Sequence, residues 1–338
     1  MNAPERAEFL ARRRAGIGGS DISAVLGLNP YKTGLQLWME KTGRSTDEPD
    51  ASAVERMHWG TVLEDVVARH YADLRGAKVQ RINQQLQHPQ CAIALANIDR
   101  AILENGKRAR WSDEEHRVLG AVGVLECKTA HALAQNSAEW GEAGTDEVPQ
   151  HYWMQCQWYL GITGLEAADL AVLFGGQKFV TYTIRRDAEI FADMLHEADS
   201  WWKRYVVADV PPQPSTEEDA RMLWKSHVAG REKIVDANTA TAVEELKAIK
   251  DQIKAFEAKE KILRDCVAIQ FGDAEAISYM GRRLATWKQN KASSKTDWKA
   301  AFEDLYGKVP DDLILPIRDT HTKTIEGARV LRIATSKE

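Results

Sequence analysis

Three acidic residues stand in or beside apolar segments, in the order helix, strand, strand. Glu64 falls in a segment from about 54 to 75 where apolar side chains recur at helical spacing. Asp99 follows a strand-like run, and Glu126 lies with Lys128 in another. Side chains alternate between the two faces of a strand, so Glu126 and Lys128 share one face. We expect the two strands to be neighbours, which would gather the three carboxylates and the lysine.

Such a set of side chains suits a divalent cation. Mg²⁺ and Mn²⁺ prefer hard oxygen ligands. Asp99 and Glu126 can supply the main ligands, the backbone carbonyl of Cys127 a further one, and Glu64 a direct or water-mediated contact. A bound dication would lower the pKa of a water molecule and so create a nucleophile. Lys128 would orient or deprotonate that water, or balance charge on a phosphate. The set therefore indicates a site that cuts a phosphodiester bond.

Each residue also has an ordinary structural interpretation. A Glu-x-Lys pair is commonly a solvated ion pair at a strand edge, and an aspartate after a strand commonly caps a turn. The ordered set is less common, because a helix that carries Gln155 follows the Glu-x-Lys strand. The order of the motifs, and not any one of them, favours a metal site.

Composition narrows the class of protein only partly. The 338 residues carry 45 Lys and Arg against 50 Asp and Glu, a net charge of −5. This charge is weak evidence against nucleic-acid binding, because a metal site itself needs acidic ligands. No apolar run approaches the roughly 20 residues of a membrane span, and the N-terminal segment lacks the apolar core of a secretory signal. Four scattered cysteines fit neither a zinc nor an iron–sulfur site, so we expect reduced thiols and a cytoplasmic location.

The run Val210-Pro-Pro-Gln-Pro214 marks the expected domain boundary, because adjacent prolines interrupt both helices and strands. It separates a domain of residues 1–210 from a C-terminal domain of residues 211–338. Apolar residues at heptad spacing predict a long helix over 239–269, paired with 216–234 as an antiparallel helical hairpin. A small α+β extension should follow, with strands near 277–279, 283–287 and 329–333 and a helix near 296–305.

The N-terminal region carries a family resemblance. Residues 14–32 read RAGIGGSDISAVLGLNPYK, and Leu37-Trp38 and the sequence EKTG at 40–43 follow. This stretch closely resembles the opening of the YqaJ-like viral recombinase family, phage-type alkaline exonucleases related to lambda exonuclease in the PD-(D/E)xK nuclease superfamily. The resemblance covers roughly residues 10–205, and several separated motifs recur in order. It implies an α/β (α+β) fold with a restriction-endonuclease-like core, a mixed central sheet flanked by helices.

The resemblance also implies an activity and partners. Members of the family are Mg²⁺-dependent exonucleases, with Mn²⁺ as a substitute, that degrade the 5′ strand at duplex DNA ends. They expose a 3′ single strand for phage-type homologous recombination by strand annealing. A single-strand annealing protein is the implied partner, and a homo-oligomer, such as a ring of three subunits, is the implied assembly. A phage or prophage origin would place the protein in the bacterial host cytosol, with no membrane partner.

The resemblance assigns roles to particular residues. Arg13 and Ser20 match an arginine and a serine that hold the terminal 5′ phosphate. A serine at a helix start, beside backbone N–H groups and an arginine, forms an anion pocket, so the chemistry agrees. Gln155 matches a helix glutamine near that phosphate. The catalytic and metal positions are matched by Glu64, Asp99, Glu126 and Lys128.

Two features depart from lambda exonuclease. The segment between Asp99 and Glu126 is longer, and its polar part, 102–118, is best interpreted as an elaborated hairpin. Arg100 stands where the family usually has a glycine after the metal aspartate. These departures cast doubt on the local turn and not on the ligand.

Other interpretations stay open at this point. The same fold could serve an endonuclease or a structure-specific nuclease, and a degenerate site would leave a non-catalytic module that binds DNA ends. The glycines of 16–19 could belong to a nucleotide-binding turn, but a polar helix and not a strand precedes them, so the dinucleotide context is missing. They could also form a plain tight turn with a helix cap.

Overall fold

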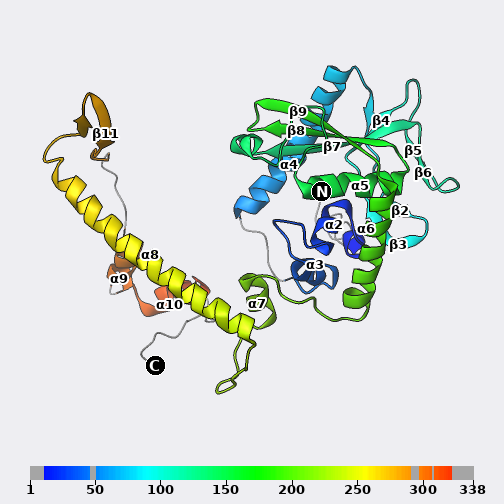
Figure 1. Ribbon diagram of the computed structural model, residues 1–338. Coiled ribbons are helices and arrows are strands. Elements are labelled where there is room, and N and C mark those ends of the chain that lie inside the picture. The colour runs from blue at the N-terminus through cyan, green and yellow to red at the C-terminus, as the bar shows by residue number, and fades with distance from the viewer. Residues whose placement is uncertain (1–10, 46–50, 291–296, 307, 322–338) are drawn as a thin grey trace. The chain divides into compact units, whose positions relative to one another are not determined.

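The computed structural model describes residues 11–45, 51–290, 297–306 and 308–321 (Figure 1). The strand expected over 329–333 lies outside the described residues. The chain groups into two compact units, Met1–Leu223 and Trp224–Glu338, and each is described here by itself. The domain limit placed at residue 210 from the sequence stays a prediction. No helix within the described ranges is long and apolar enough to cross a membrane.

A mixed five-stranded sheet forms the centre of the first unit. Strands β7 and β8 run parallel, and all other neighbours in the sheet are antiparallel. The predicted mixed central sheet of an α/β (α+β) core is therefore confirmed. In spatial order the strands are β1 (Val79–Gln80), β4 (Arg100–Leu103), β7 (Ala121–Ala130), β8 (Ala167–Phe174) and β9 (Lys178–Arg185).

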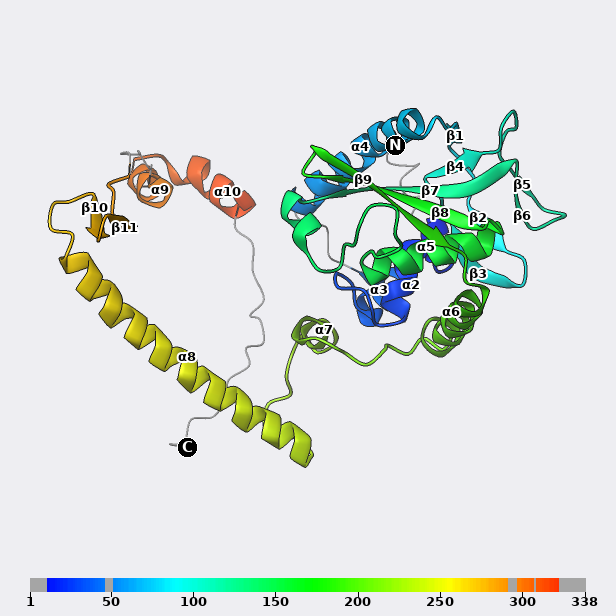
Figure 2. The same cartoon turned by 45° about the horizontal axis from the view of Figure 1, so that its top comes forward.

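Helices cover both faces of this sheet (Figure 2). Alternate side chains of β7 point to opposite faces: Val124 packs in the larger core with α5, and Leu125 and Cys127 pack against α4. The Tyr71 hydroxyl of α4 donates a hydrogen bond to Asp169 of β8, which fixes that helix on the sheet. The helices of this unit are α2 (Gly19–Val25), α3 (Gly34–Lys41), α4 (Ala51–Arg75), α5 (Gln150–Thr163), α6 (Ala188–Trp201) and α7 (Glu217–Leu223).

Local sequence signals set several element ends. Thr33 and Gln36 form a capping box at the start of α3, and the Asp187 side chain accepts from two backbone N–H groups at the start of α6. Gly164 ends α5 with a φ of 68°, in the left-handed region that favours glycine. The described residues of this unit also form the hairpins β2 (Leu86–His88) with β3 (Cys91–Ala96) and β5 (Arg110–Ser112) with β6 (Arg117–Leu119), and the short helical segments η1 (Ala132–Asn136) and η2 (Trp202–Val207). The hairpin predicted within 102–118 is the β5–β6 pair.

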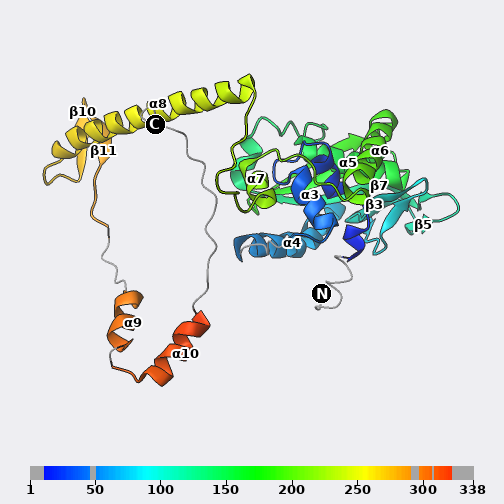
Figure 3. The same cartoon turned by 90° about the horizontal axis from the view of Figure 1, so that it is seen from below.

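The second unit begins with a helix of 33 residues, α8 (Ala237–Ile269), which is continuous in all views (Figure 3). A hairpin and two short helices follow: β10 (Ala276–Tyr279), β11 (Arg282–Thr286), α9 (Trp298–Tyr306) and α10 (Asp311–His321).

The prediction that residues 216–234 form the first helix of a helical hairpin is wrong. Of residues 216–234, the helix α7 takes only Glu217–Leu223, and α7 belongs to the first unit. The physical reason is a tertiary contact. The Asp219 carboxylate is buried and accepts a hydrogen bond from Thr33 Oγ1 at 2.7 Å, which attaches α7 to the start of α3.

Candidate metal centre

Glu126 is the most buried acid of the predicted set, with 2% of its surface exposed. Strand alternation points it toward α5, where Gln155 Nε2 donates to Glu126 Oε1 at 2.6 Å. Lys128 Nζ contacts the same oxygen at 2.6 Å. The other carboxylate oxygen, Oε2, is buried and has no hydrogen-bond partner among the residues that the structure describes. A buried charged oxygen without a partner is costly, and a cation ligand would remove that cost.

Asp99 lies next to Glu126, as expected, but not through the strand that was expected to bring it there. The strand before Asp99, β3, pairs with β2 in a separate two-stranded sheet, and it is β4, directly after Asp99, that neighbours β7. In the antiparallel β4–β7 pair, Arg100 is opposite Leu125, and Asp99 Oδ2 accepts a hydrogen bond from the Cys127 backbone N–H at 2.9 Å. Burial, reinforced by the negative charge of Glu126, raises the pKa of Asp99 to about 8. The positive charge of Lys128 opposes this shift in the pKa of Asp99 but does not outweigh it. The use of the Cys127 carbonyl as a ligand stays a prediction.

Glu64 reaches the same region from α4, but arginines hold its carboxylate. Arg81 and Arg100 each contact Glu64 Oε1 at 2.6 Å. Arg100 is 4% exposed, and its guanidinium also donates to the Asp99 carbonyl at 2.6 Å and to Asp65 at 3.0 Å. The residue that replaces the family's usual glycine therefore ties α4 to the start of β4.

Lys128 is held in its charged form. Burial favours the neutral amine, but the carboxylates of Glu126 and Asp99 outweigh it and raise the pKa of Lys128 above its usual range. Its ammonium group also lies 5.3 Å from the centroid of the Tyr152 ring. A lysine in this state suits charge balance at a phosphate better than proton abstraction.

Gln155 links the acids to a second pocket. Besides Glu126, its Nε2 approaches the Tyr159 hydroxyl at 3.0 Å. Tyr159 in turn lines a cavity of about 140 Å³ that also includes Arg13 and Ser20. Gln155 was expected at the terminal phosphate, whereas its amide here supports the Glu126 carboxylate, between the acids and that cavity.

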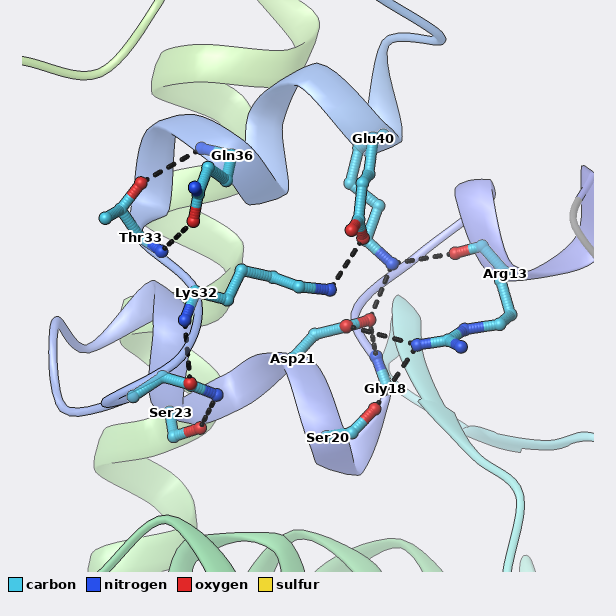
Figure 4. A network of polar contacts seen from close by, with 11 residues as sticks. Arg13, Gly18, Ser20, Asp21, Ser23, Lys32, Thr33, Gln36 and Glu40 are labelled. Carbon is cyan, nitrogen blue, oxygen red and sulfur yellow. Dashed lines mark hydrogen bonds and ion pairs between the residues drawn. The ribbon is translucent and has the colours of Figure 1, made fainter. Parts of the chain in front are cut away.

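Arg13 and Ser20 come together as the sequence predicts. Arg13 Nη2 lies 3.3 Å from Ser20 Oγ and 3.5 Å from Asp21 Oδ1 (Figure 4). Gly19 is required here, because a Cβ at that position would lie 2.4 Å from Cε1 of Tyr159. The cavity therefore has an arginine, a hydroxyl and the first turn of α2 on its wall, which is a suitable environment for an anion.

The prediction missed a buried ion pair that supports this pocket. Lys41 Nζ lies 2.6 Å from Asp21 Oδ2 and 2.8 Å from the Arg13 carbonyl oxygen, and both side chains are almost fully buried. Asp21 Oδ2 also accepts from the Gly18 N–H at 3.1 Å. Burial acts to raise the pKa of Asp21, but the positive charges of Lys41 and Arg13 prevail and lower it. In the sequence, nothing pointed to this ion pair except that Lys41 and Asp21 both lie in the N-terminal motifs quoted above.

The predicted acidic residues supply part of the ligand set that a magnesium-type ion needs. Over the described ranges of the chain, no group of three or more His, Cys, Asp or Glu side chains is arranged to hold a metal ion. Glu64 is held by arginines, so Asp99 and Glu126 are the two acids in place. Mg²⁺ is commonly bound by one or two carboxylates together with substrate phosphates. The unpartnered oxygen of Glu126 and the raised pKa of Asp99 agree with such a site.

Comparison with known proteins places the chain in a family. Residues 8–166 match the family model of the YqaJ-like viral recombinase domain. The chain is 35% identical over 314 residues to the uncharacterized protein YqaJ of Bacillus subtilis (strain 168), which covers 90% of each protein. This chain belongs to the YqaJ-like viral recombinase family.

Solved structures show weaker similarity. The alkaline exonuclease LHK-Exo from Laribacter hongkongensis is 16% identical with a TM-score of 0.43, and the match covers 60% of this chain and 93% of that one. A phage-related exonuclease from Haemophilus somnus 129PT is 12% identical with a TM-score of 0.37, over 57% of this chain and 96% of that one. At these values the likeness assigns neither a substrate nor a reaction to this chain.

The raised pKa of Asp99 predicts that metal affinity depends on pH. Below about pH 8 the folded, metal-free protein keeps a proton on Asp99, and a cation must displace it. Mn²⁺ affinity should rise about tenfold per pH unit between pH 6 and 8 and then level off. Calorimetric titration at pH 7 in buffers of different ionisation enthalpy should show proton release. An affinity that stays constant from pH 6 to 8 would contradict the prediction.

The stability of the metal-free protein should also depend on the protonation of Asp99. The folded-state pKa of Asp99 lies above its ordinary value of 3.8, so the folded state binds more protons. Stability should therefore fall as the pH rises from about 4 to about 8. Added Mn²⁺ should restore it most at the alkaline end, as thermal unfolding at several pH values will show.

Arg100→Lys should weaken the contact between α4 and β4. Lysine keeps the positive charge but lacks the guanidinium fork that contacts Glu64, Asp65 and the Asp99 carbonyl. We expect the free energy of unfolding to fall by about 1–2 kcal/mol, measured by urea denaturation. The control is Arg69→Lys, since the exposed Arg69 forms its ion pair with Asp65 within one helix. Equal losses in the two variants would show that Arg100 has no special role.

Proposed function

We propose that the chain is a divalent-metal-dependent exonuclease that degrades the 5′ strand at duplex DNA ends. The observation that carries this proposal is the Glu126 carboxylate, of which one buried oxygen has no hydrogen-bond partner among the described residues and which lies beside the Asp99 carboxyl group. Family membership adds support, because the viral recombinase domain model covers the segment that contains both acids. The exposed 3′ strand would enter homologous recombination by annealing.

The roles of the residues follow from their contacts. A bound Mg²⁺ or Mn²⁺ would supply Lewis acidity at the scissile phosphodiester. Asp99 and Glu126 would hold it, and Glu64 could join after release from its arginines. Gln155 keeps the Glu126 carboxylate oriented, and Lys128 balances the negative charge of the phosphate.

Arg13 and Ser20 would bind the terminal 5′ phosphate in the cavity of about 140 Å³. The Asp21–Lys41 pair holds the Arg13 backbone in place. Tyr159 lines the cavity, and its hydroxyl accepts from Gln155, which also donates to Glu126, so the cavity for the terminal phosphate would lie close to the catalytic acid. This arrangement suits removal of nucleotides from a 5′ end better than internal cleavage.

The proposal includes partners by family resemblance. A single-strand annealing protein would receive the exposed 3′ strand, and a homo-oligomer, for example a three-subunit ring, would keep the enzyme on its DNA. The cytosol of a bacterial host is the proposed location. Co-purification with a co-expressed annealing protein, and the mass of the assembly by light scattering, would test these points.

The central test uses linear duplex DNA labelled at the 5′ or at the 3′ end, and a closed circle. With Mg²⁺, the 5′ label should be released first as a mononucleotide, and the circle should stay intact. Chelation of the metal, or Asp99→Ala, should stop release while end binding persists. Cutting of the circle would instead support an endonuclease, and equal activity of Asp99→Ala would show that the site is assigned wrongly.

Arg13→Met should remove the preference for phosphorylated ends. Loss of a charged hydrogen bond to phosphate corresponds to about 1.5–3 kcal/mol, roughly 10- to 100-fold in kcat/KM. The effect should be confined to 5′-phosphorylated DNA, with little change on 5′-hydroxyl ends. Arg14→Met is the matched control, because Arg14 is exposed and does not line the cavity. An equal loss on both kinds of end would mean that Arg13 does not contact the terminal phosphate.

A further inference from the structure

An apolar stripe runs along α8 without cover. Six apolar side chains of the stripe are between 37% and 68% exposed, and none of the 33 residues of α8, all of them described, is buried. From Leu246 to Val267 the stripe covers about 32 Å at 1.5 Å per residue. A long helix with an exposed seam of this kind gains most of its stability from a partner. The seam has a-positions Leu246, Ile253, Glu260 and Val267 and d-positions Ile249, Phe256 and Leu263.

We propose that the α8 stripe pairs with the same stripe of a second copy of this chain, as an antiparallel coiled coil. The heptad spacing, sustained over more than three heptads, is the geometry of helix pairs. The other helices that the structure describes in this unit are too short for the role. The helix α9 has 9 residues and α10 has 11 with Pro316 inside, so neither alone spans the stripe.

Charge decides the direction of the pair. In a parallel pair in register, Glu260 of one copy would face Glu260 of the other inside the seam. Lys259 would also face Arg264 of the second copy, because g- and e-positions lie side by side. Both contacts bring like charges together. Glu245 would attract Lys250 of the second copy, but this exposed pair only offsets the Lys259–Arg264 repulsion, so the acids that meet inside the seam still disfavour the parallel arrangement.

The antiparallel arrangement removes both conflicts. With the two-fold axis between Ile253 and Phe256, these two residues pack against each other across the copies. Leu246 then meets Leu263 of the second copy, and Glu260 meets Ile249 with its carboxylate free to keep the ion pair with Arg264 on its own helix. Lys250 lies beside Glu257 of the second copy, twice in the dimer. Opposite charges therefore flank an apolar centre.

Cysteine cross-linking of the full-length chain tests the pairing. The exposed Cys266 is first changed to serine, and the three buried cysteines are kept. Protein with Leu246→Cys is mixed with protein of different tag length with Leu263→Cys and is mildly oxidised. We expect a disulfide-linked heterodimer. Each variant alone should give none, because identical positions lie about 26 Å apart along the antiparallel pair, beyond disulfide reach.

Other outcomes would overturn the proposal. Self-linking of each variant alone would establish a parallel pair. The absence of any cross-link would mean that another segment or partner covers the stripe. A second measurement avoids cysteines: Ile253→Lys should halve the mass seen by light scattering, whereas Ala258→Lys, on the opposite face, should not. An unchanged mass for Ile253→Lys would also refute the pairing.

Discussion

Glu126→Gln should lower Mg²⁺-dependent degradation of linear duplex DNA by on the order of 10³-fold. The substitution keeps the shape of the side chain, and its amide oxygen can still accept from Gln155. It removes the negative charge that faces Lys128 and the oxygen for which the described part of the chain offers no hydrogen-bond partner. Single-turnover rates on end-labelled DNA would measure the loss, and Mn²⁺ titration should show a parallel loss of metal affinity.

The matched control is Glu166→Gln, since the Glu166 side chain is 72% exposed and forms a surface ion pair with Arg186. Its activity should stay within about twofold of the wild type, because exposed ion pairs contribute little. If Glu126→Gln keeps its activity or its Mn²⁺ affinity, Glu126 does not hold the metal.

Lys41→Met should destabilise the fold by about 3–5 kcal/mol, because it leaves the Asp21 carboxylate buried without its counter-charge. The Arg13 carbonyl also loses its donor. Denaturation in urea, followed by circular dichroism, would measure the change. Arg13 should also be held less firmly in the phosphate pocket. The preference for 5′-phosphorylated ends should therefore weaken in the protein that remains folded.

Lys32→Met provides the comparison. Lys32 contacts Glu40 at 2.8 Å, but both side chains reach solvent, so the expected loss is below about 1 kcal/mol. If the two variants lose equal stability, burial does not distinguish the Asp21–Lys41 pair from a surface ion pair.

The sequence predicted the architecture well where the signals are local. Apolar spacing located α4, β7 and α8, and the order of the motifs correctly predicted that Asp99 would lie beside Glu126. The strand expected to place Asp99 there was wrong, because β4 and not the preceding β3 neighbours β7. Arg13 and Ser20 were also brought together as expected, because the helix start between them is a local feature.

The features that the sequence did not predict are contacts between distant segments of the chain. The capture of Glu64 by Arg81 and Arg100 depends on how α4 lies across the sheet, which no short motif encodes. The Lys41–Asp21 pair and the attachment of α7 through Thr33 likewise arise only when separate elements meet. Propensity predicts helices, but the hydrogen bond between Thr33 and Asp219 attached α7 to the first unit.

The close approach of Gly19 to Tyr159 has a consequence for how such chains diversify. A methyl group at position 19 would occupy the same space as the tyrosine ring. A relative with alanine there must therefore carry a smaller residue at 159, and would lose the hydroxyl that the Gln155 amide contacts. Positions 19, 155 and 159 should accordingly change as a set during evolution, and a single exchange at any one of them should be rare.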